Sequence, residues 1–226
     1  KNEWWRVLAH GLRFDYSLYM IQKILENGMD PETYVQNVRN YRSLIKQLFD
    51  AAEPDESHVA RLREAGRATH AAYATVQTED WCGDSACILP VLAPFFRAAD
   101  IQLVVVRGSE QPEFKNYYEK DGDDHIPAVS IWSKDGTELV RWIEAPEAVG
   151  TKKNAWKAEH PSFEPLYEKQ KQGDREAAKK FGALYREFLN EMAGWYQAGM
   201  WNETTRELVE ALEKKQSRTS ERTTHQ

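Results

Sequence analysis

The sequence predicts an α/β fold in which a central mixed sheet is flanked by helices. Residues 71–78 and 101–106 are apolar, β-branched runs typical of buried strands. An amphipathic run separates them, so strand, helix and strand form a βαβ unit with a right-handed crossover. Residues 128–132 and 137–143 are two further strand patterns, and the turn sequence Lys134-Asp135-Gly136 between them indicates a β-hairpin.

Helical patterns precede this core. Asp30 can cap a helix and Pro31 suits its first position, and apolar residues then recur every three or four positions. The pattern predicts one helix from residue 30 to about residue 48. A second helix is expected over residues 55–65, with Gly66 as its end, and the chain N-terminal to both is rich in aromatic residues.

The chain after the hairpin is less regular in pattern. Pro161 and Pro165 favour irregular structure in part of residues 147–173. A long amphipathic helix is expected after Asp174, and a last helix is expected to open at Asn202. The polar sequence from Lys214 is typical of a disordered tail.

These patterns divide the chain into three parts. Residues 30–213 are expected to form a single domain that includes the helical extensions, and residues 214–226 a disordered tail. Residues 1–29 form an aromatic-rich arm, which either packs on the domain or lies upstream of a native start at Met29.

Composition excludes several classes of function. The net charge is −6 and the basic residues are scattered, so we expect no nucleic-acid partner. The longest uncharged apolar run, residues 88–96, contains two prolines and is too short to cross a membrane. No histidine and cysteine cluster has metal-site spacing, so no metal is expected. Two cysteines and no secretory leader favour a reducing, cytoplasmic location.

The sequence Trp81-Cys82-Gly83-Asp84-Ser85 lies where a predicted strand gives way to a helix. The N-terminus of a helix presents unpaired N–H groups and a partial positive charge, both of which favour a thiolate. We therefore predict that Cys82 is a reactive nucleophile with a lowered pKa. The alternative is a structural cysteine at a helix start.

Two separate motifs resemble the thioredoxin superfamily. Trp81-Cys82-Gly83 is similar to the start of that family's active-site motif W-C-G-P-C, and Pro90 matches its helix-kinking proline. Ile126-Pro127, at the start of a strand, resembles the cis-proline that faces the reactive cysteine. The W-C-G-D sequence is closer to an atypical bacterial branch with helical extensions. The resemblance implies a thioredoxin-like fold with N- and C-terminal helical extensions.

Three positions depart from the family's pattern. Ser85 occupies the position of the resolving cysteine, so the motif is C-x-x-S. Val76 occupies the position of the buried acid that serves the second cysteine in many thioredoxins. Asp84 replaces the motif proline, and its charge would raise the pKa of a nearby thiol. Together the three changes predict chemistry that depends on one thiol.

Cys87 is the second cysteine of the chain. Residues five apart on a helix are separated by about 140° of rotation and ~7.5 Å of rise. That separation exceeds the reach of a disulfide, so Cys87 is expected to be a buried structural residue. Pairing with Cys82 remains possible if the first turn of the helix unwinds.

Two other positions are candidates for the substrate cleft. A cis Pro127 would leave the backbone of Ile126 free to pair with an extended substrate segment. Arg107, at the carboxyl end of its strand, could stabilise a thiolate or bind a carboxylate, or it could be a solvated strand-end residue.

The resulting hypothesis is a thiol–disulfide protein that acts through Cys82. Its mixed disulfides would be resolved by an external thiol, glutathione or another small thiol, and its partners would be protein or low-molecular-weight thiols and disulfides. An alternative is a binding module without redox turnover that uses the cleft beside Pro127. A third hypothesis, raised only by the C-x-x-S pattern, is an iron–sulfur cluster shared by two chains. The oligomeric state is left open.

Overall fold

The structure, a computed structural model, describes residues 16–119 and 121–224, and four strands in these ranges form one mixed sheet. The strands are β1 (Ala71–Thr78), β2 (Gln102–Arg107), β3 (Ala128–Ser133) and β4 (Glu138–Ile143), in the order β2-β1-β3-β4. β1 and β2 are parallel, whereas β3 runs antiparallel to both β1 and β4. The predicted α/β fold with a central mixed sheet is confirmed.

The strand register brings three loops together at one end of the strands, called this edge of the sheet below. Thr78 pairs with Arg107, so β1 and the parallel β2 end side by side. Gln77 pairs with Ala128 on the antiparallel β3, which therefore begins where β1 ends. The segment after β1 and the Ile126-Pro127 segment before β3 consequently meet at this edge.

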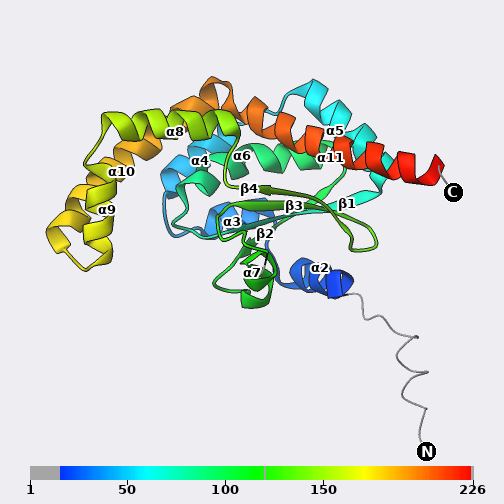
Figure 1. Cartoon of the computed structure of the whole chain (residues 1–226), viewed down its shortest axis with the longest axis horizontal. Coiled ribbons are helices and arrows are strands. Elements are labelled where there is room, and N and C mark those ends of the chain that lie inside the picture. Colours follow the sequence, from blue (N-terminus) through cyan, green and yellow to red (C-terminus); the bar gives the residue numbers. More distant parts are fainter. Residues whose placement is uncertain (1–15, 120, 225–226) are drawn as a thin grey trace, which may run out of the picture.

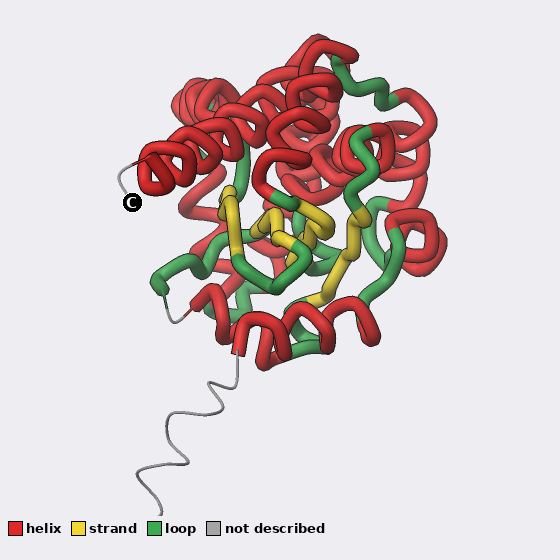
Figure 2. Tube along the Cα trace, turned by 90° about the vertical axis from the view of Figure 1, so that its right-hand side faces the viewer, coloured by secondary structure: helices red, strands yellow, loops and turns green. Residues whose placement is uncertain are grey.

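Helices lie on both sides of the sheet, as Figures 1 and 2 show from two directions. Before β1 the chain forms α2 (Tyr16–Asn27), α3 (Pro31–Asn37), α4 (Arg42–Ala51) and α5 (Glu56–Thr69). Between strands it forms α6 (Gly83–Ala98) and α7 (Pro112–Glu119). After β4 come α8 (Glu147–Glu159), α9 (Phe163–Lys171), α10 (Arg175–Trp195), the π-helical segment η1 (Tyr196–Met200) and α11 (Trp201–Thr224).

Two apolar clusters fill the space on the two faces of the sheet. The larger contains the buried face of α6 together with residues from α4, α5, α10 and α11. The smaller lies between α2, α7 and the opposite face of the sheet. Val105 belongs to the larger cluster and Val104 and Val106 to the smaller, because successive side chains of a strand point to opposite faces.

The segment before residue 30 contacts the domain. α2 packs on β2 through Met20, Ile21 and Ile24, which are buried. Met29 exchanges two backbone hydrogen bonds with Val105, at 2.9 and 2.7 Å. The first part of the predicted arm, residues 1–15, lies outside the described residues.

The single helix predicted from residue 30 is wrong. The chain leaves the helical conformation at Val38 and passes through Tyr41, whose φ of 55° is left-handed, before α4 begins. The break lets the backbone N–H of Arg39 donate to Asp80 Oδ2 at 3.0 Å. The helix is therefore interrupted where a tertiary hydrogen bond forms, although the periodic apolar pattern continues.

Three other predicted boundaries are also wrong. α5 continues past Gly66 to Thr69, and the left-handed His70 ends it instead. The segment predicted as partly irregular is non-helical only at residues 160–162 and 172–173, because it contains α8 and α9, with Pro165 in the first turn of α9, where proline is tolerated. α11 extends through the predicted tail to Thr224. Among the described residues, no helix is long and apolar enough to cross a membrane.

Candidate active site

Cys82 is the N-cap residue of α6, at the edge of the sheet where β1 ends. Its Sγ atom accepts a hydrogen bond from the Ser85 backbone N–H at 3.4 Å and donates one to the Ile126 carbonyl, also at 3.4 Å. Only 6% of the residue is exposed. The thiol therefore bridges the helix N-terminus and the segment before β3.

The surroundings of Cys82 favour the protonated thiol. Burial, and then the negative charge of Asp84, raise the pKa of Cys82 to about 11, although hydrogen bonds from Ser85 act in the opposite direction. The lowered pKa predicted from the helix N-terminus is therefore wrong. Desolvation and a neighbouring carboxylate outweigh the partial charge of the helix.

Asp84 belongs to a cluster of charged residues next to Cys82. The Nζ of Lys153, on α8, lies 2.7 Å from Asp84 Oδ1 and 2.9 Å from Glu144 Oε1. Burial raises the pKa of the Asp84 carboxyl, while the charge of Lys153 opposes the rise. The charge on α6 next to Cys82 is thus balanced by a lysine from a helix that follows the sheet.

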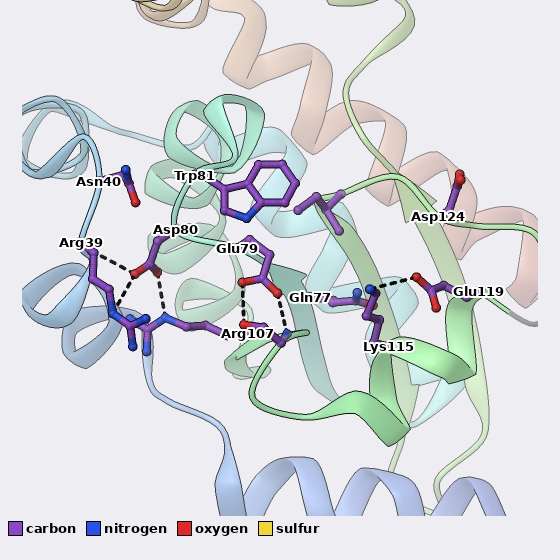
Figure 3. Close-up of a pocket in the computed structure, with 12 residues that line it drawn as sticks. Arg39, Asn40, Gln77, Glu79, Asp80, Trp81, Arg107, Lys115, Glu119 and Asp124 are labelled. Carbon is purple, nitrogen blue, oxygen red and sulfur yellow. Dashed lines mark hydrogen bonds and ion pairs between the residues drawn. The ribbon is translucent and has the colours of Figure 1, made fainter. Parts of the chain in front are cut away.

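Residues 79–82, which join β1 to α6, are called the active-site loop below. Asp80 in this loop and Arg107 form a second, buried ion pair. Arg107 Nε donates to Asp80 Oδ1 at 2.8 Å, and its Nη2 donates to the Asn37 carbonyl at 3.2 Å. Arg39 also points toward Asp80 (Figure 3). Arg107 is buried and paired with Asp80, so its suggested alternative as a solvated residue is wrong, and it ties the active-site loop to α3 and β2.

Trp81 lies on the surface beside these groups, with 62% of its area exposed. It borders a polar cavity of about 530 Å³, which is also lined by Arg107, Asp80 and Ile126 (Figure 3). The same indole borders a second cavity, on the side of Asp84 and Lys153. A group bound in either cavity would lie next to the residue that precedes Cys82.

The Ile126–Pro127 peptide bond is cis, and this segment faces Cys82. The Pro127 carbonyl accepts the Glu144 N–H at 2.8 Å, which fixes the segment to the end of β4. The Ile126 carbonyl, in contrast, has the Cys82 thiol as its donor. The backbone next to the sulfur is therefore held in place by contacts on both sides.

The thioredoxin family model matches residues 28–157, which include all four strands and the active-site loop. The chain belongs to the thioredoxin family.

Two solved structures resemble this thioredoxin-family chain. A protein of unknown function from Pseudomonas aeruginosa is 16% identical over 78% of this chain and 94% of its own, with a TM-score of 0.47. An HIV epitope scaffold is 18% identical over 57% of this chain and 79% of its own, with a TM-score of 0.46. No curated protein matches the chain.

Two residues that bear on whether a second thiol can act, Val76 and Cys87, lie in the apolar interior. Val76, at the position of the usual acid, is fully buried in the larger apolar cluster. Cys87 is in the same cluster, five residues along α6 from Cys82, and both cysteines are free. Burial raises the pKa of Cys87 well above its ordinary value. Burial, and then the negative charge of Asp84, therefore favour the protonated thiol at Cys87.

Sequence reasoning missed the side chains that surround the thiol. Lys153 was not a candidate because α8 was not predicted, and Glu144 becomes one only through its contact with Lys153. Val149, Lys153 and Trp156 recur at four- and three-residue steps and are all buried. That spacing is the signal for a helix whose inward face includes one lysine. A buried lysine needs a carboxylate partner, and Asp84 provides one.

Tyr185 was also missed. A Cβ atom added to Gly83 would lie 2.5 Å from the Tyr185 hydroxyl and 3.1 Å from Leu189 Cδ1. α10 thus contacts the first residue of α6, directly after Cys82. Glycine suits this position, because a larger residue would force the Tyr185 hydroxyl on α10 to shift.

Proposed function

We propose that this protein forms mixed disulfides through Cys82 and depends on an external thiol to resolve them. The observation that carries the proposal is the position of the Cys82 Sγ, 3.4 Å from both the Ser85 N–H and the Ile126 carbonyl. A substrate segment that follows the Ile126-Pro127 backbone would carry its own disulfide to this sulfur. Ser85 offers no second thiol there.

The chemistry is thiol–disulfide exchange. The Cys82 thiol loses its proton to solvent, and the thiolate attacks one sulfur of the substrate disulfide. A new sulfur–sulfur bond joins Cys82 to the substrate while the original bond breaks. The second substrate sulfur leaves with the electron pair and takes up a proton. An external thiol, such as glutathione, later attacks the partner sulfur as a thiolate and bonds to it, while the bond to Cys82 breaks; Cys82 leaves with the electron pair and takes up a proton.

The raised pKa of Cys82 supports long-lived mixed disulfides. A thiol with a high pKa is a poor leaving group, so attack of an external thiol on the partner sulfur, which must expel Cys82, is slow. Attack by Cys82 is slow for the same reason, because little thiolate is present at neutral pH. Cys82 would therefore react slowly with disulfides and remain bonded to its partner once it has reacted.

Intact mass spectrometry tests the proposal. Wild type, Cys82→Ser and Cys87→Ser would be incubated with 2-hydroxyethyl disulfide, a small uncharged probe. We expect one mercaptoethanol adduct on wild type and on Cys87→Ser, and none on Cys82→Ser. An adduct on Cys82→Ser, or loss of 2 Da from wild type through a Cys82–Cys87 disulfide, would contradict the single-thiol mechanism.

A second candidate function is binding without redox turnover. It is supported by the surroundings of Cys82, which favour the protonated thiol over the thiolate. In that case Cys82→Ser would keep its partners and its cellular effect. Loss of both on this one-atom change would support the exchange mechanism instead. Both candidates keep the expected cytoplasmic location, where unpaired cysteines persist.

A further inference from the structure

We propose that the cavity between the active-site loop and the α9–α10 pair binds an uncharged, apolar side chain. This side chain would be adjacent in sequence to the disulfide-bonded cysteine of a partner polypeptide. The inference rests on the proposed function and adds a class of substrate to it. The cavity has a volume of about 520 Å³, within the range of small-molecule and side-chain pockets.

A row of aromatic rings lines one side of this cavity, which is called the aromatic pocket below. The ring centres of Tyr167 and Phe181 are 5.3 Å apart, those of Phe181 and Tyr185 are 5.6 Å apart, and those of Tyr185 and Tyr41 are 6.3 Å apart. The Tyr41 hydroxyl donates to the Trp81 carbonyl at 3.3 Å. The row therefore leads from α9 to the residue before Cys82.

Exposed aromatic surface is concentrated at the aromatic pocket. In the part of the chain that the structure describes, Trp81 and Tyr167 are the two large hydrophobic side chains that are exposed, at 62% and 38%. Both border the aromatic pocket, one from the active-site loop and one from α9. Exposed aromatic side chains around a cavity are typical of a surface that binds a partner.

The charges around the aromatic pocket disfavour an anionic occupant. Lys153 is paired with Asp84 and Glu144, and Lys157 is 2.6 Å from Glu164 Oε1. Both lysines are therefore engaged by carboxylates, and the carboxylates outnumber them. An anionic ligand such as glutathione would meet repulsion, whereas an apolar side chain would contact the rings.

The aromatic pocket depends on a part of the chain outside the matched family region. The family match ends at residue 157, before α9 begins, and the α9–α10 pair projects beyond the sheet (Figure 1). Tyr185 of α10 reaches Gly83, so the pair is fixed directly against the start of α6. The selectivity inferred here is consequently a property of the C-terminal extension.

Peptide disulfides measure this selectivity. The substrates are the symmetrical disulfides of N-acetyl-Phe-Cys-amide, N-acetyl-Ala-Cys-amide and N-acetyl-Glu-Cys-amide, and the readout is the second-order rate of adduct formation on Cys82. We expect the Phe peptide to react roughly five- to tenfold faster than the Ala peptide, as for loss of one good aromatic contact, and the Glu peptide to be slowest. Equal rates for Phe and Ala would overturn the inference.

Variants of Tyr167 assign the preference to the pocket. Tyr167→Ala should reduce the ratio of the Phe rate to the Ala rate toward one, and Tyr167→Phe should preserve it. The matched control is Lys169→Ala, an exposed position on the same helix that does not border the pocket. Lys169→Ala should keep the wild-type ratio and react with 2-hydroxyethyl disulfide at the wild-type rate. A preference that survives Tyr167→Ala would contradict the proposed site.

Binding without chemistry separates this inference from the proposed function. Cys82→Ser would be titrated with N-acetyl-Phe-Ser-amide and N-acetyl-Ala-Ser-amide, with amide NMR shifts as the readout. We expect the Phe peptide to shift the amides of Tyr167 and Phe181, with a smaller effect from the Ala peptide. Absence of these shifts would overturn the pocket even if Cys82 exchanges disulfides, and their presence would support it even if Cys82 is inert.

Discussion

The reactivity of Cys82 toward an alkylating agent should be low at neutral pH and should depend steeply on pH. With a pKa of about 11 against an ordinary value of 9.0, the thiolate fraction at pH 8 is about 10⁻³ instead of about 10⁻¹. Ionisation alone therefore predicts alkylation ~100-fold slower than for an ordinary exposed thiol.

Asp84→Asn tests the cause of this slow reaction. Burial is the larger cause of the raised pKa and the charge of Asp84 the second, so the variant should lower the pKa without returning it to 9.0. We expect alkylation at pH 8 to become roughly three- to tenfold faster, the effect of removing one nearby like charge. Glu144→Gln is the matched control, because Glu144 also contacts Lys153 but follows β4 instead of lying on α6.

The assay is the initial rate of iodoacetamide labelling between pH 7 and pH 10, followed by mass spectrometry. A Cys87→Ala background restricts labelling to Cys82. The logarithm of the rate should rise by about one for each pH unit over the whole range, because the midpoint lies above it. A plateau below pH 9 would refute the reasoning, and so would an Asp84→Asn rate equal to that of the parent.

Three further predictions concern stability. Lys153→Met should lower the free energy of unfolding by about 3 kcal/mol in urea, because the side chains of Lys153 and Asp84 are only 11% and 19% exposed and a carboxylate would lose its partner; adding Asp84→Asn should recover part of this loss, and simple additivity would argue against the pair. Arg107→Met should cost a similar ~3 kcal/mol by leaving buried Asp80 uncompensated, and a cost below about 1 kcal/mol would be inconsistent with that burial. Folding raises the pKa of Cys82, so the preference of the folded state for the protonated thiol adds to stability fully below pH 9 and is lost as pH rises toward 11. Over this interval the free energy of unfolding of wild type should fall about 2–3 kcal/mol further than that of Cys82→Ser. Parallel curves of stability against pH for the two proteins would exclude this contribution.

The sheet could be predicted from the sequence because its signals are local. β-branched runs, a turn with glycine and an amphipathic run between strands all act over a few residues. The break between α3 and α4 could not be predicted in the same way. It depends on the hydrogen bond from Arg39 to Asp80, residues 41 positions apart in the chain. A periodic apolar face continued through that break and concealed it.

The position of Cys82 could also be predicted, but its ionisation could not. The W-C-G motif and the strand before it were enough to place the thiol at the start of α6. A helix N-terminus favours a thiolate, and no local sequence pattern shows how deeply the sulfur is buried. α8 and α10, which both follow the sheet in the chain, contact Asp84 and Gly83 directly after Cys82.

Slow attack and persistent binding follow from the same burial, and together they limit where selectivity can arise. A thiol that is mostly protonated reacts with few of the disulfides it meets, so partners that remain near it longest are favoured. Residence beside Cys82 depends on contacts made by the rest of the substrate, and Trp81 and Tyr167 offer exposed aromatic surface for such contacts. The aromatic pocket therefore provides the selectivity that the thiol itself lacks, which is why its variants should alter the choice of substrate more than the intrinsic reactivity of the sulfur.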